Sequence, residues 1–449
     1  MKHRLISIPF FLLRTGTAGA ALVTGLLQTY VFAHVLSPHR FSIFILVAAV
    51  GYSLWLIDFG IVKILFVQQR ARFHAGDRSD GISRQATAIV LFYFGLVSSG
   101  ALLCFLFMSI QTAAPLQEAA EFGLFFLLVA LNLVWFALRY ISIAVDEYVL
   151  FEALETVRRS GYIIGLIAVL FGMPLIVMLI ALNALWAVVV TICAKRMVLR
   201  GALFPRIGGW FEELRAFFRA NRTQIIRSGT YAVSEIYVSN YPYFIVPLLF
   251  GLGAPPIILD TTFKVFRGSA VIFAAVCDIL VPRQTSALAE RNGPTLVRAT
   301  LLAAALCSIP AALACGVLLI AADKFFAFLL GNAATIPPAT TPILIVLLIA
   351  NLTQMVTYSV IVHNGFFKEM AHIGMGLAAA MTCLAVFAVF VRLDIVQFLE
   401  AYVAIYSCSA IVGVVLMIRG PFRLAHEAAG LPEAAPHQLS GESAVPTSR

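Results

Sequence analysis

The chain has 449 residues, of which 61% are hydrophobic and only 12% are charged. A soluble globular protein cannot bury that much apolar surface, so the composition excludes the soluble classes and indicates a polytopic membrane protein. The formal net charge of +9 does not indicate nucleic-acid binding. The sequence lacks zinc-ligand spacing, a helix-turn-helix pattern and basic tracts with interleaved aromatic residues.

Apolar runs long enough to cross a bilayer, roughly 20 residues each, follow one another along the chain. They predict an all-α protein with twelve transmembrane helices. The first half has runs at 8–35, 41–62, 86–110, 120–143, 155–172 and 174–194. The second half has runs at 226–251, 257–282, 299–321, 342–363, 371–391 and 394–418. The first run is too long for a signal-peptide core, so we interpret it as an uncleaved span.

The distribution of Lys and Arg among the connections orients these spans. Arg158 and Arg159 stand in the connection after the fourth span, and eight basic residues between positions 195 and 227 follow the sixth. The connections on the other side hold only Arg40, Lys324 and Arg392. Because Lys and Arg are retained on the cytoplasmic side, both basic connections face the cytoplasm and a complete hairpin lies between them. Both termini are then cytoplasmic.

The long basic connection separates two lobes, and a polar tail follows the second lobe. We expect a first lobe at 1–195, a cytoplasmic linker at 196–225, a second lobe at 226–424 and a disordered cytoplasmic tail at 425–449. Within the linker, the stretch GWFEELRAFFRAN (209–221) mixes aromatic residues with Arg at helical spacing and predicts an interfacial helix. The tail is rich in Ala, Pro, Ser and Glu, a composition typical of disorder.

Cysteine and histidine residues do not predict a metal site. All seven cysteines fall in apolar spans, where they are interpreted as small buried hydrophobic residues. His34 and His39 stand at the edge of a connection, and nothing nearby pairs them into a metal site.

Two basic residues interrupt the eighth span, in the stretch TTFKVFRGSAVIF (261–273). Each costs about 2.5–3.5 kcal/mol at the centre of a span. Lys264 and Arg267 are three residues apart and share one helix face, so both can point into a water-filled cavity and bind an anion. The alternative is that Lys264 extends to the outer interface and Arg267 pairs with a carboxylate. Arg14 in the first span is a third candidate, unless it anchors the chain at the cytoplasmic surface.

The seventh span carries the most interior acidic residue, Glu235, just before the stretch YVSNYPYF (237–244). Glu235, Tyr237 and Asn240 are candidates for lining the cavity or for ion coupling. Glu235 can take up a proton or a sodium ion, or it can form a static ion pair. Pro242 removes a backbone hydrogen bond and is a candidate hinge for alternating access.

Three further polar residues favour structural roles. Asp58, near the cytoplasmic end of its span, is predicted to cap or orient a helix. Asn351 and Gln354 in the tenth span are predicted to form hydrogen bonds between helices.

The stretch VFAHVLSPHRFSIFILVAAVGYSLWLIDFGI (31–61) resembles the start of the Wzx-type polysaccharide flippases, which belong to the multidrug/oligosaccharidyl-lipid/polysaccharide (MOP) exporter superfamily. Those chains open with a span ending in a Leu-Gly-Pro-x-x-Phe-Gly-like turn, followed by a span that closes on Asp-x-Gly. The matching positions in this sequence are Leu36, Pro38, Phe41, Asp58 and Gly60.

Two positions depart from that pattern, because Ser37 and Ser42 stand where the family often has Gly. The stretch ILVPRQTSALAERNG (279–293) resembles the family's eighth span as it runs into a Pro-containing loop. Twelve spans, a division into two sets of six and the absence of large soluble loops agree with the resemblance along nearly the whole chain.

The resemblance implies two pseudo-symmetric six-helix bundles around a central cavity. It implies a carrier in the bacterial inner membrane that moves an undecaprenyl-pyrophosphate-linked oligosaccharide from the cytoplasmic to the periplasmic leaflet. The product would serve O-antigen, capsule or exopolysaccharide synthesis, with other polysaccharide assembly proteins as candidate partners. No cofactor is expected, and a sodium-ion or proton gradient is the candidate driving force.

Related flippases of lipid II (MurJ-like) place cavity arginines in their first and eighth spans, which correspond here to Arg14 and Arg267. They also have an arginine in the second span, and this sequence has none there. The resemblance therefore implies that Arg14 and Arg267 are cavity arginines, although the arginine of the second span is missing. Together with Lys264, which shares a helix face with Arg267, they are predicted to bind the diphosphate.

Three other functions remain as alternatives. A polytopic glycan polymerase, ligase or glycosyltransferase needs a sizeable outer loop or paired outer acidic residues, but the longest outer connection, 322–341, has one Asp and no His. A drug or cation antiporter of the same superfamily should favour acidic cavity residues over basic ones. A scaffold without transport activity is the third.

Overall fold

The computed structural model describes residues 8–76, 80–111, 115–205, 208–363 and 366–427, without the side chains of 8–15 and of a few other positions. The described part of the chain consists of helices joined by short connections. The first half comprises α1 (Ile8–Val35), α2 (Pro38–Ser53), η1 (Leu54–Asp58), α3 (Ile61–Ala75), α4 (Gly81–Gln111), α5 (Leu116–Ala130), α6 (Asn132–Ala144), α7 (Tyr148–Leu170) and α8 (Leu175–Leu199).

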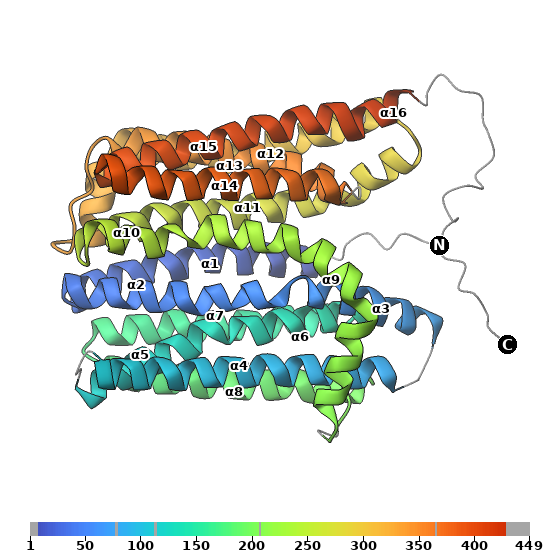
Figure 1. The fold of residues 1–449 in the computed structure, drawn as a ribbon, viewed down its shortest axis with the longest axis horizontal. Helices are drawn as coiled ribbons and strands as arrows, with labels where there is room; N and C mark the ends of the chain where they lie inside the picture. Colours follow the sequence, from blue (N-terminus) through green and yellow to red (C-terminus); the bar gives the residue numbers. More distant parts are fainter. Residues whose placement is uncertain (1–7, 77–79, 112–114, 206–207, 364–365, 428–449) are drawn as a thin grey trace.

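The second half begins with α9, which contains part of the expected linker. It comprises α9 (Trp210–Asn240), α10 (Pro242–Phe250), α11 (Ala254–Ala289), α12 (Gly293–Leu330), α13 (Thr340–His363), α14 (Phe367–Val391), α15 (Ile395–Met417), η2 (Ile418–Phe422) and α16 (Arg423–Glu427). Figure 1 shows the two halves side by side with their helices nearly parallel. Contacts between them run from α1 and α2 to α11, and from α3 and α4 to α9.

Nine stretches among the described residues are long and apolar enough to cross a membrane. They correspond to nine of the expected spans. The other three expected spans lie in α7, in α9 with α10, and in α11. The molecule is therefore a multi-pass α-helical membrane protein, and its apolar exterior (Ile320, Phe390 and Leu248 are more than three-quarters exposed) suits contact with lipid.

The expected second span, 41–62, ends earlier than the apolar pattern predicts. Phe59 and Gly60 both adopt positive φ angles, of 43° and 75°, and turn the chain between η1 and α3. The Asp58 carboxylate accepts hydrogen bonds from the backbone N–H groups of Gly60 and Val62, each at 3.1 Å, and from the Tyr93 hydroxyl at 2.7 Å. The prediction that Asp58 caps a helix is confirmed.

Helix α7, which contains the fifth expected span, begins earlier than the sequence predicts. Arg158 and Arg159 do not stand in a cytoplasmic connection, because α7 begins at Tyr148 and carries both residues inside the helix. The apolar run starts later than the helix itself, because residues 148–159 include charged side chains, and Glu155 pairs with both arginines inside the helix.

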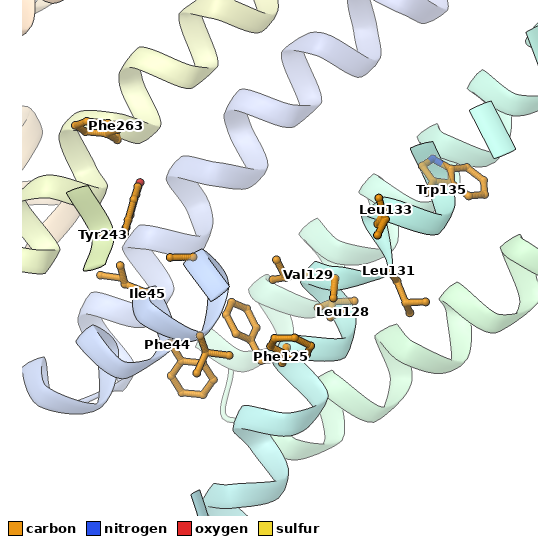
Figure 2. Packing of buried hydrophobic residues seen from close by; sticks show 14 of the residues in the cluster. Phe44, Ile45, Phe125, Leu128, Val129, Leu131, Leu133, Trp135, Tyr243 and Phe263 are labelled. Atoms are coloured by element: carbon orange, nitrogen blue, oxygen red, sulfur yellow. The ribbon is translucent and has the colours of Figure 1, made fainter. Parts of the chain in front are cut away.

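Aromatic side chains fill the interior of each half. Phe44 and Phe125 meet edge to face between α2 and α5, with ring centroids 5.1 Å apart. Tyr243 and Phe263 pack edge to face between α10 and α11 at 5.7 Å. Figure 2 shows these two pairs in the halves to which they belong. Such contacts hold helices together in lipid, where the hydrophobic effect between helices is absent.

One of the two predicted bonds between helices is present. The Asn351 amide donates to the Ser269 hydroxyl at 2.8 Å and to the Phe266 carbonyl at 3.2 Å, and so joins α13 to α11. Gln354 instead donates to Tyr358 of its own helix, at 2.6 Å.

The linker stretch 209–221 forms the start of α9. In Figure 1 this part of α9 runs across the ends of the first-half helices, and α9 contacts α3 and α4. Its place at a membrane surface and the lobe boundaries stay predictions. Of the predicted tail, 425–427 belong to α16, and 428–449 lie outside the described residues.

Candidate functional site

A cavity of about 440 Å³ lies between the two halves. On the first half its wall consists of residues from α1, α2, η1, α5, α6, α7 and α8, and on the second half of residues from α10 and α11. Its aromatic lining includes Tyr52, Trp55, Tyr162, Trp186 and Tyr243. Its charged lining consists of Arg158, Arg159, Asp260, Lys264 and Arg267. We call this space the central cavity.

Lys264 is held by partners from both halves of the molecule. Its ammonium group lies 2.7 Å from Oδ2 of Asp260, one turn earlier on α11. It also donates a hydrogen bond of 2.9 Å to the Thr29 hydroxyl of α1. The Tyr243 hydroxyl donates to the other oxygen of Asp260 at 3.3 Å. Lys264 thus faces the cavity as one member of an ion pair, which the sequence interpretation did not include.

Arg267 has a different set of partners. Its Nη2 donates to the Ser239 carbonyl at 2.6 Å and to Oδ1 of Asn240 at 2.9 Å. The guanidinium lies over the Tyr243 ring at 4.9 Å from the centroid. Among the described side chains, no carboxylate lies within ion-pair distance of Arg267. Its positive charge is therefore oriented by neutral groups and remains free to bind an anion.

Asn240 owes its position to the helix break that the sequence predicts at Pro242. The α9 helix ends at Asn240, and α10 begins at Pro242 after a single residue, Tyr241. Pro242 carries no backbone N–H, so the Val238 carbonyl, four residues earlier, loses its helical partner and accepts a hydrogen bond from the Tyr402 hydroxyl at 3.4 Å. The Ser239 carbonyl in the same turn accepts the Arg267 guanidinium.

A cluster of three charges on α7 faces Lys264 and Arg267 across the cavity. Oε1 of Glu155 lies 2.7 Å from Nη2 of Arg158 and 2.6 Å from Nε of Arg159. Oε2 accepts a second bond from Nε of Arg158, also at 2.7 Å. Arg158 additionally stacks over the Trp186 ring at 4.6 Å. Glu155 precedes Arg158 by three residues and Arg159 by four, and this spacing in the sequence predicts ion pairs along one helix face.

A smaller cavity of about 150 Å³ adjoins the central cavity and shares Arg158 and Arg159 with it. Its wall adds Glu152 and Glu155 of α7 and Arg139 of α6. The buried Glu152 carboxylate accepts a hydrogen bond of 3.1 Å from the Thr17 hydroxyl of α1. We call this space the side cavity. Five basic and three acidic described side chains line the two cavities, an excess of two positive charges.

The other candidate residues lie elsewhere. The side chain of Arg14 lies outside the described residues, although its backbone belongs to α1. Glu235 is exposed and does not line the central cavity. The Tyr237 hydroxyl forms a 2.9 Å hydrogen bond with Thr382 of α14, and its ring stacks on Tyr241. The structure thus brings together Lys264, Arg267 and Asn240, with Glu235 and Tyr237 on another face of α9.

The two halves also touch at the end of the molecule that carries the α1–α2 turn. The buried Ser42 hydroxyl of α2 accepts a hydrogen bond from the Gly253 N–H at 2.9 Å. Its single hydrogen lies within hydrogen-bond distance of two carbonyl groups, that of Pro38 at 2.8 Å and that of Gly253 at 2.9 Å. Nearby, the rings of Tyr30 and Phe328 stack with centroids 4.9 Å apart. We call the Ser42–Gly253 pair of bonds the α2 latch.

Solved structures of MATE transporters share this fold. One is an inward-facing multidrug resistance MATE family transporter of the MOP superfamily, with a TM-score of 0.58 and 13% identity over 95% of this chain and 97% of that chain. An outward-facing structure of such a transporter matches with a TM-score of 0.58 and 12% identity, over 93% and 95% of the two chains. A variant of the Vibrio cholerae MATE transporter VcmN matches with a TM-score of 0.61 and 13% identity, over 92% and 98%.

Sequence comparison adds no closer relative, since no family model and no curated protein matches the chain. At such low identity the likeness to solved structures establishes the fold alone. The chain has the fold of a membrane transporter, with two helical bundles around a central cavity.

Proposed function

We propose that this protein is a flippase that moves a diphosphate-linked oligosaccharide lipid from the cytoplasmic to the outer leaflet by alternating access. The observation that carries the proposal is the position of Arg267 in the central cavity without a carboxylate partner among the described side chains. Arg158 and Arg159 stand on the opposite wall. Guanidinium groups on two sides can bind the oxygens of both phosphates in a bidentate manner.

The balance of charge supports the same cargo. A diphosphate diester carries two negative charges, and the described lining of the two cavities has an excess of two positive charges. Binding would therefore reduce the net positive charge of the site, which lowers the cost of holding charged groups within the membrane. The lipid tail can remain in the bilayer while the polar headgroup passes through the cavity.

Alternating access requires the two halves to separate at one end at a time. Pro242 is the candidate hinge, since it divides α9 from α10 beside the residues that orient Arg267. Glu235 remains a candidate for coupling to a proton or sodium-ion gradient. Location in the bacterial inner membrane, cytoplasmic termini and association with polysaccharide assembly proteins belong to the same proposal.

A drug or cation antiporter is the second candidate, because the fold fits it equally well and solved structures with this fold include multidrug resistance transporters. The cavities contain the acidic residues Asp260, Glu152 and Glu155. However, Asp260 is already paired with Lys264, and Glu155 with two arginines. The free charge in the central cavity is positive, which favours an anionic cargo.

The test uses purified protein in proteoliposomes that contain a diphosphate lipid with a fluorescent sugar headgroup. Quenching of label in the outer leaflet, with and without a proton or sodium gradient, measures headgroup movement. We expect movement with the wild-type protein and its loss with Arg267→Ala. Movement no faster than in protein-free vesicles would overturn the proposed function.

A further inference from the structure

Glu155 occupies the two arginines that face the central cavity. Its two oxygens accept three short contacts from Arg158 and Arg159, between 2.6 and 2.7 Å. The Glu155 side chain is 9% exposed, while those of Arg158 and Arg159 are 13% and 25% exposed. The carboxylate is thus buried behind the guanidinium groups, and the guanidinium groups reach the cavity.

The groups around Glu155 come from several helices. On α7 itself they are Arg158, Arg159 and Glu152, and Arg139 of α6 lines the same side cavity. The neighbouring α8 presents Trp186, over which Arg158 stacks, and no charged residue to the two cavities. Helix α1 contributes Thr17, which binds Glu152. Across the central cavity, α11 contributes Arg267 and the Lys264–Asp260 pair, and α2 and α7 contribute the phenols of Tyr52 and Tyr162.

Glu155 and a phosphate would use the same donors. A carboxylate and a phosphate both present paired oxygens to the planar guanidinium group, so one site cannot hold both at full occupancy. The Glu155 carboxylate and an external anion therefore compete for the guanidinium groups of Arg158 and Arg159. The external anion must exceed Glu155 in charge or in the number of oxygens, and a diphosphate does both.

A displaced Glu155 would be a buried carboxylate without a cationic partner. Such a group costs several kcal/mol and becomes neutral by taking up a proton where water can supply one. The side cavity, of about 150 Å³, adjoins Glu155 and has the size and the polar lining that water requires.

We propose that Glu155 is an internal competitor for the anionic cargo. The diphosphate replaces the Glu155 carboxylate on Arg158 and Arg159, and the released carboxylate takes up one proton from water in the side cavity. The inference rests on the proposed function and adds a proton to the binding step. Raising the pH keeps Glu155 ionised and on the arginines, so cargo affinity falls as pH rises.

The experiment measures proton uptake when a probe binds to the full-length protein in nanodiscs. The probe is farnesyl-diphosphoryl-N-acetylglucosamine, a diphosphate diester whose charge does not change near neutral pH. Isothermal titration calorimetry at about pH 6 and about pH 8, in two buffers with different ionisation heats, gives both the affinity and the number of protons exchanged.

For the wild-type protein we expect uptake of up to one proton per probe, and affinity that falls by up to about a hundredfold between the two pH values, because each proton taken up lowers the affinity about tenfold per pH unit. Glu155→Gln should take up no proton and bind the probe on the order of tenfold more tightly at the higher pH. Glu155→Asp keeps the competing negative charge and should therefore keep proton uptake. This variant tests the proposal if the glutamine variant does not fold.

Glu147→Gln is the matched control. Glu147 also accepts two arginines, Arg196 and Arg200, but lines neither cavity. This variant should behave as wild type.

The inference is overturned if wild-type protein binds the probe without taking up a proton, or if Glu155→Gln keeps the wild-type uptake. Either result leaves the proposed function intact, because the probe still binds. Absence of probe binding at both pH values would overturn the inference and the proposed function together.

Discussion

Arg267 and Lys264 lie one helical turn apart, but they differ in what their removal leaves behind. Arg267→Ala frees a backbone carbonyl and the amide of Asn240, and both are neutral. Lys264→Ala leaves Asp260 as a buried carboxylate without its cation. We therefore expect Arg267→Ala to abolish headgroup movement with little loss of stability. Lys264→Ala should lower the free energy of unfolding by about 3–5 kcal/mol.

Thermal unfolding of the two purified variants in the same detergent measures this difference. Lys264→Ala combined with Asp260→Asn serves as the control, since it removes both members of the pair and should recover most of the lost stability. An Arg267→Ala protein that aggregates during purification would contradict the prediction and assign Arg267 a structural role.

The partners of these residues show what the sequence can predict at this scale. Asp260 and Lys264 are four residues apart, and Glu155 precedes Arg158 and Arg159 by three and four. Both spacings predict ion pairs on a helix. The partners of Arg267 come from α9, 27 and 28 residues earlier in the chain. Local spacing cannot reveal such a contact, so the hydrogen-bond partners of Arg267 can be identified only from the fold.

At the scale of helices, the α2 latch connects the start of α2 to the connection between α10 and α11. Ser42→Ala removes the acceptor of the Gly253 N–H and the hydroxyl hydrogen that the Pro38 and Gly253 carbonyl groups share. We expect the amide hydrogens of residues 251–254 to exchange roughly five- to tenfold faster, which corresponds to the net value of one hydrogen bond. Hydrogen-exchange mass spectrometry of that peptide measures the effect.

Ser53→Ala is the control for the α2 latch. Ser53 ends the same helix, but its hydroxyl bonds to the Ala49 carbonyl within that helix. Its removal should leave exchange at 251–254 unchanged. If Ser42→Ala also leaves that exchange unchanged, the latch does not hold the two halves together.

A second contact between helices should depend on pH. Glu147, in the connection from α6 to α7, accepts Arg196 and Arg200 at the end of α8. Burial opposes ionisation of Glu147, but the hydrogen bonds from Arg196 and Arg200 outweigh it and lower the pKa of this carboxyl. A carboxyl with a lowered pKa stabilises the fold above its unfolded pKa, near 4.5, and loses that contribution as the pH falls further.

Thermal unfolding of wild type and Glu147→Gln across this range measures the contribution. Because both arginines are more than 40% exposed, we expect a difference of about 1 kcal/mol or less at neutral pH. The difference should vanish below the folded pKa. A difference that persists in acid would mean that the glutamine disturbs packing rather than charge.

The apolar runs locate most helices, but they do not locate every helix end. The run 41–62 continues smoothly through Asp58, Phe59 and Gly60, although the helix breaks there. The break depends on a left-handed Phe59, whose ring lies where Gly229 of α9 leaves room for it. A side chain on Gly229 would come within 2.8 Å of that ring. The turn is therefore fixed by tertiary packing, which an apolar pattern does not record.

At the scale of the whole molecule, the likeness to solved MATE transporters, at 12% and 13% identity, establishes the fold and does not identify the cargo. We infer the cargo instead from the charged side chains of the two halves that line the cavities. The described lining has five basic and three acidic side chains, and the acidic residues Asp260 and Glu155 are already paired. An organic cation would have to break these pairs and meet Arg267 without compensation. A dianionic headgroup would meet free positive charge.

The excess of positive charge in the cavities predicts that anionic ligands, and not cationic ones, stabilise the protein. A diphosphate diester should raise the thermal unfolding temperature of the wild-type protein, because a ligand that binds the folded state stabilises it. The effect should weaken with Arg267→Ala and should fall as salt is raised. Ethidium and tetraphenylphosphonium should have no effect at the same concentrations. Stabilisation by either cation, with none by the diphosphate, would instead favour a cation antiporter built on the same two bundles.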